Sequence, residues 1–338
     1  MRSKIKRNSN FELLRIISIV LIISQHYVQY ALYNSNDYII NILKCLCNWA
    51  TVGVGCFFLI SGYFLSNSQT TLNKKNIINI LSAVWLYDFT SKTIILFVEH
   101  KLSSYEIIKI AFQSLISPFN FTYWFITVYL FVYCFSPIFN DLLNGINKKK
   151  YVTLLISLFL LIMIQKTWFR NGGNTDLILY GIYTYIVAYY FRNQISPQTE
   201  YIIYRYLKYI SIIFIAFFIM DNLLNCHYLE WINRIISFPQ FIIATTLFLK
   251  VKRKKPTYSS LVNNIAKSSL AVYIIHMSLA FRMYGWDLLI INKNQNIVIA
   301  LLSLIYSILI IIACSYALDT VRQNIFNYLY NIKQKYNE

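Results

Sequence analysis

The first apolar segment of the chain carries an arginine and a histidine, Arg15 and His26, in the run RIISIVLIISQH. Because a helix turns about 100° per residue, the eleven steps between them leave the two side chains only about 20° apart around the axis. A rise of about 1.5 Å per residue separates them by roughly 16 Å in depth. Ionisable groups are costly in hydrocarbon, so those found in a membrane segment are candidates for function. We therefore expect the chemistry of this protein near this pair.

Further polar residues share this face of the predicted helix. Relative to Arg15, Glu12 lies at roughly +60°, Ser18 at roughly −60° and Gln29 at roughly −40°. A polar stripe on an otherwise apolar helix indicates that the helix lines a polar interior. The alternative is an ion pair between Glu12 and Arg15 at the membrane surface, with His26 bonded to a neighbouring helix as part of the packing.

A second histidine occurs near the end of the chain, in the run SSLAVYIIHM. Ser269, Tyr273 and His276 fall within about 60° on one helix face. Imidazole groups suit proton transfer near neutral pH. The alternative for His276 is a core histidine whose hydrogen bonds are satisfied. His100 and His227 lie in or beside predicted outward loops, where we expect solvated side chains without a role in catalysis.

The segment WATVGVGCFFLISGYFLSN contains small residues that suit helix packing. Gly53 and Gly55 permit close approach of another helix, and Ser61 precedes Gly62 in the inner half. A packing role for Ser61 is favoured over a nucleophile, because no Ser–His–Asp pattern accompanies it.

Two opposite charges, Asp88 and Lys92, are four residues apart in a third apolar segment. This spacing places them on one helix face, where they can pair and lower the cost of burial. We favour a structural ion pair, with contact to a substrate as the alternative.

The composition is that of an integral membrane protein. Of the 338 residues, 57% are hydrophobic and 13% are charged, against about 25% charged in an average soluble domain. Apolar stretches near the roughly 20 residues needed to cross a bilayer recur throughout. We predict an all-α polytopic bundle, a single membrane domain over 1–338. The ten predicted spans are 11–33, 44–66, 77–98, 121–140, 151–167, 176–192, 207–224, 233–250, 265–284 and 296–318.

The charge pattern predicts an orientation. The net charge is +18, and the Lys and Arg residues gather between apolar segments, which favours membrane orientation over nucleic-acid binding. The basic loops near 74–75, 148–150, 192–208 and 250–255 fall on the cytoplasmic side, as do the N-terminus and the tail with Arg322, Lys333 and Lys335. The basic leader precedes no small-residue cleavage site, so the first helix is read as a retained anchor.

Two smaller features complete the prediction. The stretch 103–117 has too few apolar positions to span and is predicted to be an interfacial or re-entrant helix. The six cysteines include Cys45 and Cys47 without metal-ligand spacing, so no metal site is expected. An outward disulfide that involves Cys45, Cys47 or Cys226 is left open.

Four runs together resemble the membrane acyltransferase-3 family, whose members usually O-acylate cell-surface polysaccharides. The runs are N-F-E-L-L-R with its R-x10-H spacing to His26, F-F-L-I-S-G-Y-F-L at 57–65, Y-W-F-I-T-V-Y-L-F-V-Y-C-F-S-P at 123–137 and S-L-A-V-Y-I-I-H at 269–276. Each run is weak alone, but four in order along the chain are specific. The resemblance implies a multi-pass protein of the cell membrane. It also implies acyl-CoA, usually acetyl-CoA, as donor and a polysaccharide or lipid-linked glycan as acceptor.

For such a reaction we predict roles for the residues above. His26 would act as general base on the acceptor hydroxyl, with a transient acyl-histidine as the less favoured variant. Arg15 would hold the donor. Supporting positions would be filled by Glu12, Ser61, Asp88, Tyr273 and His276.

The chain departs from the family at the donor site. Many relatives carry an arginine-rich run after the second helix, whereas this chain reads NSQTTLNKKN. Only Lys74 and Lys75 could assist Arg15 there, and lysine lacks the bidentate fork of arginine. The rival functions are a transporter or flippase of a glycan or small molecule, which also needs intramembrane polar groups, and a protein that modulates polysaccharide assembly by interaction alone.

Overall fold

The computed structural model describes residues 7–32, 42–43, 46–66, 72–168, 174–223, 238–290 and 296–335. Within these ranges the chain is helical and contains no β-strand, which confirms the all-α class. The helices are α1 (Ser9–His26), η1 (Tyr27–Ala31), α3 (Ala50–Leu65), α4 (Lys74–Val98), α5 (Ser104–Ile116), α6 (Trp124–Leu143), α7 (Lys148–Trp168), α8 (Thr175–Asn193), α9 (Pro197–Leu223), α11 (Phe238–Lys252), α12 (Ser260–Lys267), α13 (Ser269–Met277), η2 (Phe281–Gly285), α14 (Trp286–Leu289) and α15 (Ile297–Lys335).

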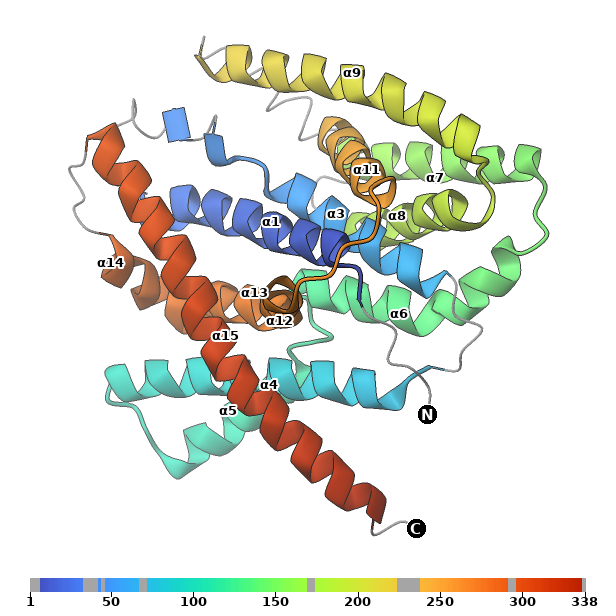
Figure 1. The fold of residues 1–338 in the computed structure, drawn as a ribbon. Helices are drawn as coiled ribbons and strands as arrows, with labels where there is room; N and C mark the ends of the chain where they lie inside the picture. The colour runs from blue at the N-terminus through green and yellow to red at the C-terminus, as the bar shows by residue number, and fades with distance from the viewer. Residues whose placement is uncertain are drawn as a thin grey trace.

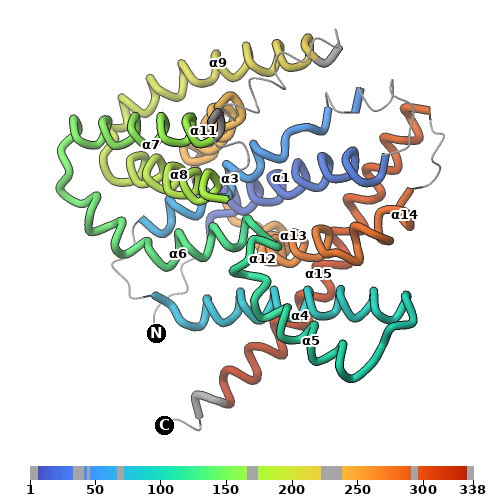
Figure 2. The backbone as a smooth tube through the Cα atoms, turned by 180° about the vertical axis from the view of Figure 1, so that it is seen from behind, coloured from blue at the N-terminus to red at the C-terminus, as the bar shows by residue number. Residues whose placement is uncertain are grey.

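Helix α1 runs through the middle of the bundle. Figures 1 and 2 show α1 beside α3, with α4 and α5 along one edge, α9 along the opposite edge and α15 crossing the bundle obliquely. The contact between α1 and α3 depends on a glycine. A Cβ atom at Gly53 would stand 2.5 Å from the carbonyl oxygen of Ser18. The predicted close approach at Gly53 is therefore confirmed, and Gly55 is similarly tight against Ala244 and Tyr180.

The beginning of α1 is held by the segment before α12. The Asn8 side chain caps the helix by accepting from the amide of Asn10. The Ser9 hydroxyl accepts from the amide of Ser259 at 2.7 Å and donates to Oδ1 of Asn263 at 2.8 Å. These bonds join residues about 250 positions apart in the chain. They fix the entry of α1, and hence the residues around Arg15, against α12.

The end of α1 departs from the regular α-helix. From Tyr27 the chain continues as the π-helical turn η1, which shifts every later side chain around the axis. Gln29, predicted on the Arg15 face, is exposed. The prediction for Gln29 was wrong because it assumed one helical repeat throughout.

The range 265–284 was predicted as one spanning helix and is instead broken. Helix α12 ends at Lys267, α13 covers Ser269–Met277, and Ser278 is extended with ψ 151° before η2 begins. The hydroxyl of Ser91 in α4 accepts a hydrogen bond from the backbone amide of Ala280 at 2.9 Å. A side chain of a neighbouring helix thus satisfies a backbone donor that the break would leave unpaired.

Every other predicted span contains helix, although several bounds differ. Five helical stretches in the described ranges are long and apolar enough to cross a membrane: Ser9–Ala31, Lys74–Val98, Trp124–Leu143, Pro197–Asp221 and Ile297–Ile332. The number ten and the cytoplasmic placement of both termini stay predictions. The predicted stretch 103–117 forms the helix α5, with exposed apolar side chains such as Phe112 and Ile108.

Two predicted cytoplasmic segments are helical rather than loops. Helix α9 begins at Pro197, inside the predicted loop 192–208. Helix α15 continues past 318 to Lys335, and Arg322 is buried there. Arg322 forms a 2.7 Å ion pair with Asp319, whose carboxylate also accepts from the Tyr87 hydroxyl of α4. The apolar pattern ends at 318, but this polar contact with α4 stabilises the helix beyond it.

Candidate functional site

The two histidines that the sequence singled out contact each other. Nδ1 of His26 lies 3.0 Å from Nε2 of His276, and the ring centroids are 5.2 Å apart. His276 is fully buried, whereas His26 is partly accessible. Helices α1 and α13 therefore bring together groups 250 residues apart. The alternative reading, a histidine bonded to a neighbouring helix, is also met by this contact, so the contact alone does not assign a role.

The hydrogen bonds of His276 fix the protonation pattern of the pair. Nδ1 of His276 lies 2.5 Å from the carbonyl oxygen of Val272, and a carbonyl only accepts, so this nitrogen carries the proton. With both rings neutral, Nε2 of His276 must accept from Nδ1–H of His26. His26 is then left with an unprotonated Nε2 that makes no hydrogen bond within the described part of the chain.

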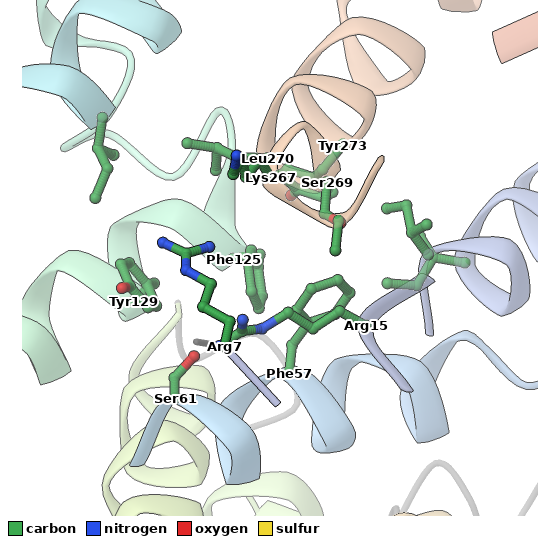
Figure 3. Close-up of a pocket in the computed structure, with 14 residues that line it drawn as sticks. Arg7, Arg15, Phe57, Ser61, Phe125, Tyr129, Lys267, Ser269, Leu270 and Tyr273 are labelled. Atoms are coloured by element: carbon green, nitrogen blue, oxygen red, sulfur yellow. The ribbon is translucent and has the colours of Figure 1, made fainter. Parts of the chain in front are cut away.

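A cavity of about 230 Å³ lies beside Arg15, and we call it the Arg15 cavity. Its lining includes three cations, Arg7, Arg15 and Lys267, together with aromatic rings and the hydroxyl residues Ser61 and Ser269. Figure 3 shows Lys267, Ser269 and Tyr273 on the side opposite Arg7 and Arg15. The cations and apolar rings suit a ligand that has both anionic and apolar parts.

A second cavity, also of about 230 Å³, lies beside His26, and we call it the His26 cavity. Gln25, Thr51, Trp124, Asp176 and Tyr180 contribute to its lining. The amide of Ala50 donates to Oε1 of Gln25 at 2.8 Å, so the Gln25 amino group is left as a donor.

The same helices line both cavities at different levels. Helix α3 contributes Ser61 to the Arg15 cavity and Thr51 to the His26 cavity, while α6 contributes Tyr129 to the first and Trp124 to the second. The cavities share two lining residues, Ile22 of α1 and Tyr273 of α13.

Tyr273 is 5% exposed and stands between the two cavities. Its hydroxyl is buried and approaches the Phe125 backbone, but it makes no hydrogen bond within the described chain. Its ring packs against Phe125 at 5.3 Å and against His276 at 6.1 Å between centroids. A buried hydroxyl without a partner is costly, which marks this position as a candidate for contact with a ligand.

Glu12 and Arg15 form an ion pair at 2.7 Å, as the alternative reading of the polar stripe proposed. The Glu12 residue is 5% exposed, and its second carboxylate oxygen is buried without a hydrogen-bond partner within the described chain. Arg7 approaches the first oxygen to 4.0 Å. Ser18, the other member of the stripe, donates to the carbonyl oxygen of Leu14 in its own helix. The stripe is therefore real from Glu12 to His26, but only Arg15 and His26 of it line a cavity.

Asp88 belongs to a separate polar cluster. It pairs with Lys92 at 2.7 Å, as predicted, and accepts from the hydroxyls of Ser117 at 2.6 Å and Tyr123 at 3.0 Å. Neither Asp88 nor Lys92 lines either of the two cavities. The cluster joins α4 to the α5–α6 connection, which favours the structural reading.

Lys74 and Lys75 lie at the start of α4. Lys74 is exposed, and the ammonium group of Lys75 lies 4.8 Å from the centre of the Tyr330 ring. Neither residue lines the Arg15 cavity. Their role in donor binding stays a prediction, while the cations that the structure places at the cavity are Arg7 and Lys267.

Several residues of the two cavities were not singled out from the sequence. Gln25 and Lys267 lie next to runs that were recognised, so their positions could have drawn notice. Asp176 lies in α8, in no recognised run, and nothing in the sequence ties it to His26.

No cysteine and no histidine other than His26 is among the described residues that line the two cavities. Cys47, Cys56, Cys134 and Cys314 are free thiols. Cys45, Cys226 and His227 lie outside the described residues, and His100 is exposed in the turn after α4. Among the described residues no group of three or more His, Cys, Asp or Glu is arranged to hold a metal ion.

Comparison with known proteins identifies the family. The model of a family described as an acyltransferase domain matches residues 8–316, nearly the whole chain. No curated protein and no solved structure matches the chain. The match spans α1, both histidines and every residue named in the lining of the two cavities except Arg7. The chain belongs to the membrane acyltransferase-3 family and is a membrane acyltransferase.

Proposed function

We propose that this acyltransferase moves an acyl group, in the simplest case acetyl, from cytoplasmic acyl-CoA to a hydroxyl of a cell-surface polysaccharide or its lipid-linked precursor. The observation that carries the proposal is the His26–His276 contact beside two adjoining cavities of different character. The family supplies the reaction class. The contact leaves Nε2 of His26 able to accept a proton, and the two cavities offer separate sites for a donor and an acceptor.

The Arg15 cavity is the proposed donor site. Arg15, Arg7 and Lys267 offer positive charge to phosphate groups, and Phe57 and Phe125 offer apolar surface to the pantetheine arm. In the predicted orientation this cavity faces the cytoplasm, where acyl-CoA is made. The arm would reach toward His26, roughly 16 Å deeper along α1, past the wall formed by Ile22 and Tyr273.

His26 is the proposed general base. The acceptor hydroxyl gives its proton to Nε2 of His26 while its oxygen bonds to the thioester carbonyl carbon. The carbon–sulfur bond then breaks, and the imidazolium returns the proton to the leaving thiolate, so the products are an ester and free CoA. His276 holds His26 in the tautomer that this step requires.

Tyr273 is the proposed oxyanion donor. Its hydroxyl is buried and without a partner next to both cavities, so it could donate to the negative charge that develops on the carbonyl oxygen. Ser61, which lines the Arg15 cavity, is proposed to position the donor.

The test is acyl transfer by the purified protein in liposomes, with acetyl-CoA labelled in the acetyl group and a glycan acceptor. We expect base-labile label on the glycan in amounts that match the free CoA released. Glycan movement across the bilayer without consumption of acetyl-CoA would instead support a transporter. Release of CoA with no label on any glycan would contradict the polysaccharide acceptor.

A further inference from the structure

The His26 cavity combines a carboxylate, neutral hydrogen-bonding groups and apolar surface. Asp176 is the one residue with a full charge among the described residues of its lining, and it makes no ion pair or hydrogen bond within the described chain. Around it lie a free amide donor on Gln25, the hydroxyl of Thr51 and the buried, unpartnered hydroxyl of Tyr180. The indole of Trp124 completes the wall.

This set of groups is complementary to a ring that bears several hydroxyls. Each sugar hydroxyl both donates and accepts, so it can donate to the carboxylate of Asp176 or to Nε2 of His26 and accept from the amide of Gln25. The C–H face of the ring can lie on the Trp124 indole, since aromatic side chains combine apolar area with fixed geometry. A pocket with a few convergent polar groups on an apolar wall is typical of small-molecule sites.

The sign of the charge limits the ligand further. A carboxylate that is only partly solvated repels a second anion at close range and strengthens hydrogen bonds from neutral donors. No lysine or arginine is among the described residues that line this cavity. The face that a ligand would touch is therefore acidic.

We propose that the His26 cavity is a subsite for a neutral pyranose-type sugar and that Asp176 is its specificity-determining residue, which selects against acidic sugars. This inference rests on the proposed function for the view that the bound sugar is the acyl acceptor. It adds the chemical class of that acceptor and the residues that select it.

Asp176 also lies in the first turn of α8, where a negative side chain stabilises the helix through its interaction with the helix dipole. A purely structural role of that kind would make the Asp176→Asn variant less stable and reduce the binding of all ligands alike. The proposed role instead changes the preference between ligands. Asp141→Asn is the matched control, because Asp141 is exposed in α6 and lines neither cavity.

The experiment is equilibrium dialysis of the full-length protein in detergent with radiolabelled methyl hexosides and methyl hexuronides. We expect the wild type to bind at least one neutral hexoside about 10-fold more tightly than the matching hexuronide. Asp176→Asn should lower the affinity for the hexoside by about 10-fold, the range of a hydrogen bond to a charged group, and should remove the preference for the hexoside over the hexuronide. Asp141→Asn should change neither the affinity nor the preference. An unchanged preference in Asp176→Asn, or a wild type that prefers hexuronides, would overturn the inference.

A second variant and a second readout keep the inference separate from the proposed function. Loss of acetyl-CoA binding in Asp176→Asn would show that this variant fails to fold. The test then passes to Trp124→Leu, which should lose affinity for the hexoside and keep its affinity for acetyl-CoA. Hexoside binding with the expected preference, but no transfer of label from acetyl-CoA, would overturn the proposed function and leave the sugar subsite standing. If the protein acylates a glycan but Asp176→Asn keeps the wild-type preference for hexosides, the inference about Asp176 is overturned and the proposed function stands.

Discussion

The Arg15 cavity and the His26 cavity have the same volume, about 230 Å³, and share Ile22 and Tyr273, yet their charges are opposite. Three cations line the first, whereas a carboxylate and an imidazole line the second. Cavities that differ in charge suit ligands that differ in charge. This difference agrees with the proposal of an anionic donor and a neutral acceptor that meet at the shared wall. The predictions below test this division, beginning with the largest expected effect.

Removal of the base should have the largest effect. We expect His26→Ala to lower kcat for acetyl transfer by about 10²- to 10⁴-fold, the usual contribution of a general base, while acetyl-CoA binding in the Arg15 cavity persists. Transfer of labelled acetyl in membranes measures the loss. The control is His100→Asn, since His100 is exposed with φ 55°, a conformation that asparagine tolerates. Full activity of His26→Ala at normal expression would remove His26 from the mechanism.

Removal of Arg15 should weaken the binding of the acyl donor and leave the binding of the acceptor unchanged. Because a lone Arg15 variant would strand the buried Glu12 carboxylate, the variant is the double change Glu12→Gln with Arg15→Gln, compared with Glu12→Gln. We expect the KM for acetyl-CoA to rise by about 10- to 100-fold, the range of charged hydrogen bonds. If the double variant were impaired only in membrane insertion or orientation, donor binding by Arg15 would be rejected.

Loss of the histidine partner should act on turnover alone. We expect His276→Ala to lower kcat by about 10-fold with the acceptor KM unchanged, because Nδ1 of His26 loses the acceptor that fixes its tautomer. His276→Gln, which still offers an acceptor oxygen, should recover part of kcat. A purely structural role would lower thermal stability in both variants and allow no recovery of kcat.

The smallest effect decides which cations assist Arg15. We expect Arg7→Gln with Lys267→Gln to raise the KM for acetyl-CoA by about 5-fold or less per cation, as for partly exposed charges, with the difference shrinking at high salt. Lys74→Gln with Lys75→Gln should leave this KM unchanged, because neither lysine lines the cavity. If instead the Lys74 and Lys75 variant raised the KM and the Arg7 and Lys267 variant did not, the phosphates of acetyl-CoA would bind at the start of α4, as the sequence suggested.

The sequence by itself determined the helical class, the membrane character and the family, and it pointed to the candidate site residues. Apolar stretches of spanning length and few charges require a helical membrane protein, and Arg15, His26, Tyr273 and His276 were identified because polar groups on apolar helices are costly. Local spacing also predicted the Asp88–Lys92 pair and gave the Glu12–Arg15 pair as an alternative, and both form at 2.7 Å. Such pairs follow from helix geometry alone, so they require no knowledge of the fold.

Only the tertiary structure decided which polar groups meet. The contact between His26 and His276 joins α1 to α13, and Asp176 reaches the same cavity from α8, at positions that no local spacing encodes. The π-turn after His26 and the break at Ser278 were also missed, and at the break a hydrogen bond to Ser91 of α4 stabilises irregular backbone that local patterns disfavour. Local periodicity sets the face of each helix, but packing between helices decides which faces enclose a common cavity.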